Sequence, residues 1–131
     1  MRIMVDTNVL ISALLFPTTN MNKVFEKISQ NHTLVICSYV IDEMHDVARR
    51  KFPDKMQAVV KMLSKMSYEI VYTPQIIEND LFEIRDIDDY PILYTAIKEG
   101  IDIFISGDKD FDDINIEYPQ ILKPSEFLEG Y

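Results

Sequence analysis

Short runs of apolar residues alternate along this chain with longer segments whose apolar residues recur at helical spacing, and this alternation restricts the possible folds more than any other feature. Strands that alternate with helices pair in parallel, because each helix returns the chain to the same end of the sheet. We therefore predict an α/β fold of three layers, α/β/α, around a mostly parallel central sheet of about five strands. The predicted strands are residues 2–5, 34–37, 70–72, 103–106 and 120–122, and the predicted helices are residues 8–15, 22–30, 39–51, 53–66, 90–99 and 125–128, with a short helical turn at 75–81.

Three residues are expected to mark the ends of predicted helices. Ser38 can cap the helix at 39–51, and Pro53 suits the first turn of the next helix. Gly100 follows the helix at 90–99 and suits a left-handed C-cap.

The length of the chain and its lack of linkers predict a single domain over residues 1–131. The sequence contains no repeat, no low-complexity tract and no Gly/Ser linker, and 131 residues suffice to bury one core. It contains no stretch of about 18 apolar residues that could span a bilayer, and no export signal. The single cysteine, Cys37, cannot form an internal disulfide and fits a buried strand position in a reducing compartment. We expect a cytoplasmic domain without membrane contact.

The acidic charge of the chain argues against a tight, sequence-independent grip on nucleic acid. The formal net charge is −9 at pH 7, whereas proteins that bind phosphate backbones usually carry an excess of Lys and Arg. The charge is unevenly spread: residues 49–65 carry six bases and one acid, residues 78–89 carry six acids and one base, and residues 99–117 carry seven acids and one base. We expect the basic segment to attract an anion and the acidic segments to repel one unless a cation lies between. Each block alone is also typical of solvated surface.

Aspartates follow two of the predicted strands at the point where each strand ends. Asp6 lies between the strand at 2–5 and a helix, and Asp108 follows the strand at 103–106. Because the carboxyl ends of parallel strands share one edge of the sheet, where ligands of such folds bind, both carboxylates are expected at that edge. Taken singly, either carboxylate could simply cap the turn that follows it.

Two further acids occupy helical positions that should face the core. Glu43 recurs at helical spacing with the apolar residues of the helix at 39–51, so its carboxylate requires a partner. Asp89 lies at the buried corner of the first turn of a later helix, whereas Asp86 and Asp88 are assigned to the preceding loop. Glu43 could instead pair with a buried Lys or Arg, and Asp89 could cap its helix or favour the helix dipole.

The four acids Asp6, Glu43, Asp89 and Asp108 cannot all ionise close together without a counter-charge, because like charges and burial both raise a carboxyl pKa. A hydrated divalent cation removes this conflict, and Mg²⁺ or Mn²⁺ prefers carboxylate oxygens. Zinc is disfavoured, since neither histidine has ligand spacing to the cysteine or to the other histidine. One or two hard cations suit phosphodiester hydrolysis, in which a metal lowers the pKa of the attacking water and steadies the leaving oxygen.

These motifs, in this order, resemble those of the PIN-domain ribonucleases. Together they cover nearly the whole chain, and the ordered set is specific although no single motif is. The closing segment is most similar to the VapC-like toxins of prokaryotic toxin–antitoxin pairs. The matching stretches are Asp6-Thr7-Asn8 after the first strand, Glu43 in the helix that Ser38 opens, Asp89 before a helix of the form Asp-x-x-Ile-Leu-x-x-Ala, and Ser106-Gly107-Asp108-Lys109-Asp110-Phe111 after a strand.

The resemblance implies an endoribonuclease that hydrolyses phosphodiester bonds in RNA with one or two Mg²⁺ or Mn²⁺ ions. It also implies a homodimer and a cognate antitoxin protein that holds the enzyme inactive. Asp6 and Asp89 resemble direct metal ligands of the family, Asn8 and Ser106 resemble small polar residues that orient the acids or a water, and Asp110 resembles a further carboxylate. The residues that match the catalytic, metal-binding acids of the family are Asp6, Glu43, Asp89 and Asp108. The residues that bind RNA stay unassigned.

Three other interpretations stay open at this stage. A receiver domain that is phosphorylated on aspartate has a similar length and an acidic Mg²⁺ site, but it needs an acid after a central strand, where this chain has Tyr72-Thr73-Pro74. A non-catalytic PIN module that binds RNA or an antitoxin would keep the fold without turnover. A structure-specific DNA nuclease of the same fold is separated from an endoribonuclease only by substrate assays.

Overall fold

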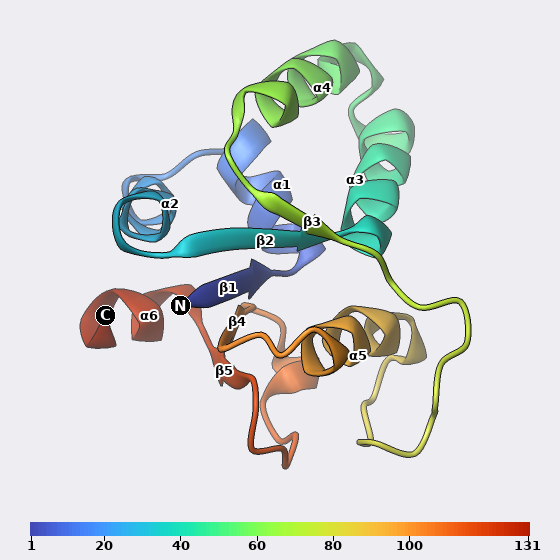
Figure 1. Cartoon of the computed structure of the whole chain (residues 1–131). Helices are drawn as coiled ribbons and strands as arrows, with labels where there is room; N and C mark the ends of the chain where they lie inside the picture. The colour runs from blue at the N-terminus through green and yellow to red at the C-terminus, as the bar shows by residue number, and fades with distance from the viewer.

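A computed structural model describes all 131 residues, and it shows a five-stranded sheet with six α-helices packed around it (Figure 1). The strands are β1 (Arg2–Val5), β2 (Thr33–Cys37), β3 (Glu69–Val71), β4 (Ile103–Ile105) and β5 (Gln120–Leu122). The α-helices are α1 (Thr7–Leu15), α2 (Thr19–Asn31), α3 (Ser38–Lys51), α4 (Met56–Lys65), α5 (Tyr90–Lys98) and α6 (Pro124–Gly130). Three short 3-10 helices lie between them, namely η1 (Pro53–Lys55), η2 (Ile87–Asp89) and η3 (Lys109–Phe111).

The sheet has the order β3-β2-β1-β4-β5, and every neighbouring pair is parallel. β1 is the central strand, and its Met4 lies opposite Val35 on β2 and Phe104 on β4. The prediction of an α/β fold with about five mostly parallel strands is therefore confirmed. All strands end at the same edge of the sheet, so the residues that follow them come together there.

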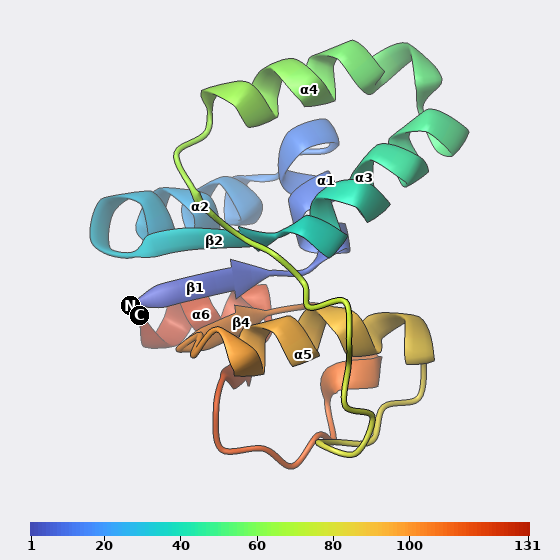
Figure 2. The same ribbon diagram turned by 45° about the vertical axis from the view of Figure 1, so that its right-hand side comes forward.

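Helices cover both faces of the sheet. From β1 through β2 to β3, each new strand is added on one side of β1, whereas β4 is added on the other side. Because the crossover connections are right-handed, this reversal places the connecting helices on opposite faces of the sheet. α1 packs against α2, α3 and α4, and α2 packs against the C-terminal α6. α5 lies in front of the strands in Figure 2, with α1, α2 and α6 behind them. None of these helices combines the length and the apolar character that crossing a bilayer requires.

The central strands are apolar on both faces, as expected for a parallel sheet covered by helices. Ile3, Met4 and Val5 of β1 are fully buried, as is every residue of β4. Cys37 is buried at the end of β2, where the sequence predicted it.

Two of the predicted helix ends are confirmed, and the third is wrong. Gly100 has a φ of 64° after α5, and Pro53 opens η1, although the helix predicted over 53–66 is divided into η1 and α4. Ser38 does not cap α3: Cys37 occupies the N-cap position, and the Ser38 hydroxyl accepts a hydrogen bond from the backbone N–H of Thr73 at 2.9 Å. Thr73 follows β3, and β3 lies next to β2 in the sheet. The Ser38 oxygen that was predicted to cap its own helix therefore accepts a hydrogen bond from a residue 35 positions away instead.

The segment 72–86 between β3 and η2 forms no helix, so the helical turn predicted at 75–81 is wrong, and a turn at Asn79 and Asp80 is all that forms there. This segment is tied to α5 by Tyr90, whose hydroxyl donates to the carbonyl oxygen of Glu78 and accepts from the N–H of Leu81 at 3.3 Å. The ring of Phe82 also stacks on that of Tyr90, with centroids 4.2 Å apart. Tertiary contacts thus fix the segment that leads to Asp86 and Asp89.

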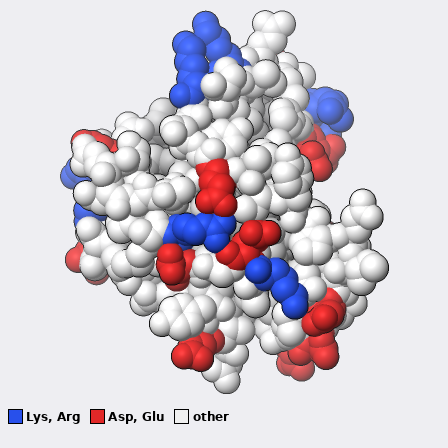
Figure 3. All heavy atoms as spheres, viewed as in Figure 1, with Lys and Arg blue, Asp and Glu red and all other residues white.

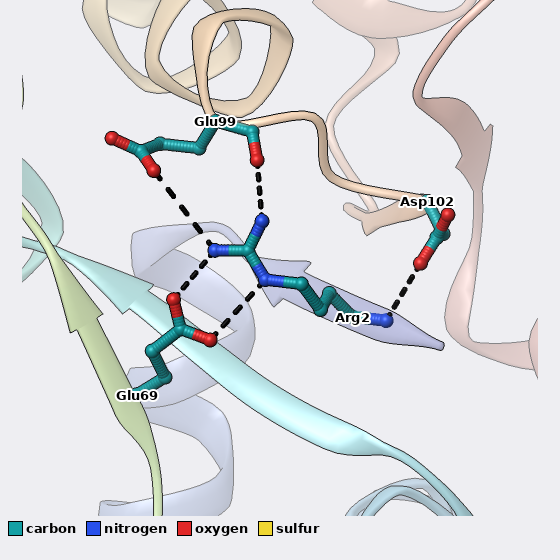
Figure 4. Close-up of polar contacts among 4 residues, drawn as sticks. All are labelled: Arg2, Glu69, Glu99 and Asp102. Carbon is teal, nitrogen blue, oxygen red and sulfur yellow. Dashed lines mark hydrogen bonds and ion pairs between the residues drawn. The ribbon is translucent and has the colours of Figure 1, made fainter.

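At the amino end of the strands, Arg2 links three segments of the chain (Figure 4). Its guanidinium binds the Glu69 carboxylate with two contacts, of 3.2 and 2.5 Å, and donates to the carbonyl oxygen of Glu99 at the end of α5. Its backbone N–H donates to Asp102 Oδ2 at 2.8 Å. The pKa of Arg2 is raised, chiefly by its hydrogen bond to Glu69. Arg2 therefore holds β1, β3 and α5 together at the edge opposite the ends of the strands.

We expect Arg2→Met to lower the free energy of unfolding by about 1 kcal/mol, because a bidentate but partly exposed pair and one carbonyl contact are lost. Urea denaturation measures this change. Arg50→Met is the matched control, since Arg50 is 59% exposed and pairs only with Asp46 of its own helix. An equal loss of stability in both variants would contradict the role of Arg2.

Candidate metal centre and active site

Asp6 directly follows β1, and its side chain is almost fully enclosed. It is 4% exposed, and its Oδ1 accepts a hydrogen bond from the backbone N–H of Val9 at 2.9 Å, which caps α1. Its Oδ2 accepts a hydrogen bond from the hydroxyl of Ser106, although the two residues are 100 positions apart. They meet because β1 and β4 are neighbours in the sheet. After β1 the chain continues to β2 on one side, and after β4 it continues to β5 on the other side. Parallel sheets bind ligands at the ends of two strands that are related in this way.

Ser106 connects Asp6 to a second acidic turn after β4. Its hydroxyl donates to Asp6 and accepts from the backbone N–H of Asp108 at 3.0 Å. Asp108 in turn accepts from the N–H of Asp110 at 2.9 Å and caps η3. Ser106 is 2% exposed, so this chain of hydrogen bonds fixes the orientation of two acids from inside the protein.

A third group of acids combines η2 and the residue before it with Asp110 of η3. Carboxylate oxygens of Asp86, Asp89 and Asp110 lie within 4.8 Å of one another. Asp86 also accepts a hydrogen bond from the N–H of Asp88 at 3.0 Å and thereby caps η2. Asp88 is exposed, whereas Oδ2 of Asp89 is buried and has no hydrogen-bond partner. Asp89 therefore occupies the inward position that the helical spacing predicted.

Glu43 and Tyr39 approach this group from one side of α3. Glu43 is half-buried. Burial is the main cause of the raised pKa of Asp6, Asp89 and Tyr39, and the charge of Glu43 adds to it in all three. The Tyr39 hydroxyl donates to the carbonyl oxygen of Asp88 at 3.1 Å. This contact joins the first turn of α3 to η2, which presents Asp89.

The pKa values of two acids are strongly raised by this crowding. Burial raises the pKa of Asp6 to about 6, with smaller contributions from the charges of Asp108 and Glu43, against the opposing effect of hydrogen bonds from Ser106 and Val9. Burial also raises the pKa of Asp89 to about 7, helped by the charges of Asp108, Asp86, Asp110 and Glu43. Near pH 7, ionising both Asp6 and Asp89 therefore costs free energy.

We call this group of six acids the acidic site; its members are Asp6, Glu43, Asp86, Asp89, Asp108 and Asp110.

The four acids predicted to be catalytic lack basic partners. None of the ion pairs of the structure includes Asp6, Glu43, Asp89 or Asp108. Asp110 is 3.7 Å from Arg85 Nε, but the Arg85 side chain is 80% exposed and contributes little. The alternative in which a buried Lys or Arg neutralises Glu43 is therefore wrong.

The structure leaves Asn8, one of the predicted supporting residues, without a hydrogen bond to an acid, and it adds Asp86 to the site. Asn8 is exposed and forms no hydrogen bond with an acid, although it lines a small hollow together with Asp108. Asp86, assigned to a loop, belongs to the closest group of carboxylates. Its spacing of three residues from Asp89, on a turn that opens a helix, is the signal that could have identified it.

Within the acidic site, Asp86, Asp89 and Asp110 bring carboxylate oxygens close enough together to hold a divalent cation. All its donors are carboxylate oxygens, the ligands that Mg²⁺ and Mn²⁺ prefer. The buried oxygen of Asp89 has no partner within the protein, and such an atom is costly unless another group binds it. Asp89 and the acids around it are the residues that could hold the ion.

Much of the basic charge lies in one stretch of the chain, residues 49–65. On the face shown in Figure 3, Lys and Arg gather at the top over α4 and beside α3, whereas Asp and Glu are more frequent in the lower half. Arg49, Arg50 and Lys51 form the last turn of α3, and Lys61 and Lys65 are exposed on α4. The charge asymmetry of the sequence is thus also an asymmetry of the surface.

Comparison with known proteins gives a consistent result. The family model described as PIN domain matches residues 2–110. Among solved structures, VapBC2 from Rickettsia felis, crystallised with a DNA fragment from its promoter, has a TM-score of 0.68 at 20% identity over 93% of this chain and 97% of that chain. VapC20 from Mycobacterium tuberculosis, described as a toxin that cleaves the sarcin-ricin loop, has a TM-score of 0.58 at 15% identity over 84% of this chain and 92% of that chain. A search of the curated proteins found no match.

Proposed function

The chain belongs to the PIN-domain family, and from this premise and the acidic site we propose that the protein is a Mg²⁺- or Mn²⁺-dependent endoribonuclease. The observation that carries the proposal is the buried oxygen of Asp89, which has no hydrogen-bond partner and lies among carboxylates whose only basic neighbour is the exposed Arg85. An acidic site that served only to cap turns would have no reason to leave that oxygen unsatisfied. The likeness to VapC20 supports RNA as the substrate class.

In this proposal Asp6 and Asp89 bind the metal directly, and Glu43 and Asp108 bind it directly or through water. Asp86 and Asp110 lie close enough to Asp89 to bind an ion together with it, and the proposal allows one ion or two. When bound, the ion supplies a Lewis acid beside the scissile phosphate and lowers the pKa of the attacking water.

The other residues of the site position these acids. Ser106 holds Asp6 Oδ2 and the turn at Asp108 in one hydrogen-bonded unit, and Val9 fixes the other oxygen of Asp6. Tyr39 keeps η2 against α3. Asp6 and the turn at Asp108 are thus oriented before an RNA arrives, which is the preorganisation that catalysis requires.

We further propose that the protein is the toxin of a toxin–antitoxin pair, inhibited by a cognate antitoxin and active as a homodimer. The likeness to the toxin–antitoxin complex VapBC2 supports this assignment. The basic residues of α3 and α4 would hold the RNA backbone on either side of the cut, because the acids alone repel phosphate.

The test is metal-dependent cleavage of RNA by the purified chain. We expect cleavage in Mg²⁺ or Mn²⁺ that leaves 5′-phosphate ends, complete loss in EDTA, and recovery when Mn²⁺ is added back. Gel analysis of a labelled structured RNA measures this. RNA binding without cleavage at saturating Mn²⁺ would favour a non-catalytic module, and cleavage of DNA alone would favour a DNA nuclease.

A further inference from the structure

Beside the acidic site, a cavity of about 380 Å³ lies between β5, the start of α6 and the segment that follows η3. Ser106 and Asp108 line it, so the cavity and the acidic site share a wall. Its apolar lining includes the buried ring of Phe111 and the half-buried side chains of Ile114 and Ile116. Cavities of this size and mixed lining hold small organic groups.

The residues of β5 line this cavity, and the free edge of the strand carries main-chain hydrogen-bonding groups. The N–H of Gln120 donates to Asp102, and the carbonyl of Leu122 accepts from Ser106, both at 3.0 Å, so residues 120 and 122 face β4. Because successive residues of a strand face opposite sides, the N–H and C=O of Ile121 face the free edge. Neither group forms a hydrogen bond with a turn or loop residue. Ile121 also lines the cavity. A donor and an acceptor therefore lie side by side, as they do on the edge of a nucleobase.

The charges around the cavity favour a ligand part that is not anionic. The carboxylates of Asp112, Glu117 and Glu126 line it and can only accept hydrogen bonds. Lys123 is the basic residue of the lining, and its Nζ is 4.0 Å from an oxygen of Asp112. A phosphate would be repelled from this environment, whereas an uncharged ring that carries an amino group matches it.

We propose that this cavity binds the nucleobase of a nucleotide next to the scissile phosphate, and that it prefers adenine, guanine or cytosine, which carry an exocyclic amino group, over uracil. The proposal rests on the proposed function, because phosphodiester chemistry at the adjoining acids is what makes RNA the ligand. A peptide that adds a strand to β5 fits less well, since the strand has three residues and one of them, Ile121, directs both main-chain groups outward.

The test uses uncharged nucleosides in EDTA, so that neither a metal nor cleavage is involved. Adenosine, cytidine and uridine are titrated into the full ¹⁵N-labelled chain. We expect the amide signals of Ile121 and Glu117 to shift, and adenosine and cytidine to bind about fivefold more tightly than uridine, as one additional hydrogen bond provides. Equal affinities, or shifts confined to other surfaces, would overturn the proposal.

Two variants and one control define the position of the ligand. Ile116→Trp fills the cavity, and Ile121→Pro removes the outward N–H at an edge position where proline is tolerated. Each should weaken adenosine binding about fivefold or more. Ile76→Trp makes the same change as the first variant at an isoleucine that is 87% exposed, and it should leave binding unchanged. The amide spectrum of each variant shows whether it is folded.

The outcomes separate this proposal from the proposed function. Unchanged binding in folded Ile116→Trp would overturn the cavity assignment and leave the ribonuclease proposal intact. Absence of RNA cleavage by the wild-type chain would count against the ribonuclease and not against nucleoside binding. Shifts at Ile121 with an uncharged extended tetrapeptide, but with no nucleoside, would assign the edge to a protein partner and overturn the proposal.

Discussion

Replacing Asp6 with asparagine is expected to lower the rate of RNA cleavage at saturating Mg²⁺ by more than about 100-fold. Mutation of residues that only hydrogen-bond to a metal ligand already lowers metal affinity or activity by about 10- to 100-fold, and Asp6 is proposed to bind the metal itself. The asparagine side chain has the same size as that of aspartate, and its amide oxygen can still accept the hydrogen bond from the N–H of Val9, so α1 retains its cap. The lost property is the negative charge at the position where β1 and β4 meet. The cleavage rate of a labelled RNA measures the effect, and titration with Mn²⁺ measures the loss of metal affinity separately.

The matched control for this prediction is Asp42→Asn. Asp42 is exposed on α3, next in sequence to Glu43, and the same change of charge there should leave cleavage and Mn²⁺ affinity unchanged. Circular dichroism shows that both variants are folded. Undiminished cleavage by Asp6→Asn at saturating Mg²⁺ would remove Asp6 from the mechanism.

In EDTA, the free energy of unfolding is expected to fall as the pH rises from about 4 to about 7. Asp6 and Asp89 have pKa values near 6 and 7 in the folded chain and ordinary values near 3.8 in the unfolded chain, so the folded state binds more protons in this range. Their contribution to stability is complete below the unfolded pKa and is lost as the pH passes through the folded pKa. For the buried Asp6 alone the shift corresponds to about 3 kcal/mol. Urea denaturation across this range measures the slope.

The same experiment with Mn²⁺ links the slope to the acidic site. A bound cation neutralises the carboxylates, so it should restore much of the lost stability at about pH 8 and little at about pH 4, where protons already neutralise them. Asp6→Asn should flatten the slope in EDTA and raise the melting temperature near pH 8 by several degrees. A metal-free protein whose stability is constant from pH 4 to pH 7 would contradict the raised pKa values.

The elements of the fold were largely predictable because their signals are local. β1 and β5 begin and end where the sequence predicted them, and α5 begins at Tyr90 as predicted. The misassigned parts depend on distant partners. Ser38 bonds to Thr73 instead of capping α3, and the segment 72–86 takes its shape from Tyr90.

The candidate site was predictable in part for the same reason. Helical spacing distinguishes Asp89 from Asp88, and the half-buried side chain of Asp89 and the exposed side chain of Asp88 agree with that choice. The inclusion of Asp86 in the closest group of carboxylates, and the lack of a hydrogen bond between Asn8 and any acid, depend on how loops fold over the edge of the sheet. No local pattern encodes those positions.

The sequence by itself determined the order of strands and helices along the chain and the type of residue that follows each strand. Both depend on apolar runs and helical spacing, which are properties of neighbouring residues. Only the tertiary structure decided which acids meet. The strand order places β4 beside β1, so a hydroxyl 100 residues away reaches Asp6, and the packing of η2 leaves one oxygen of Asp89 buried without a partner. Close approach between distant segments follows from the packing of the whole sheet, and that packing is a property of no single segment.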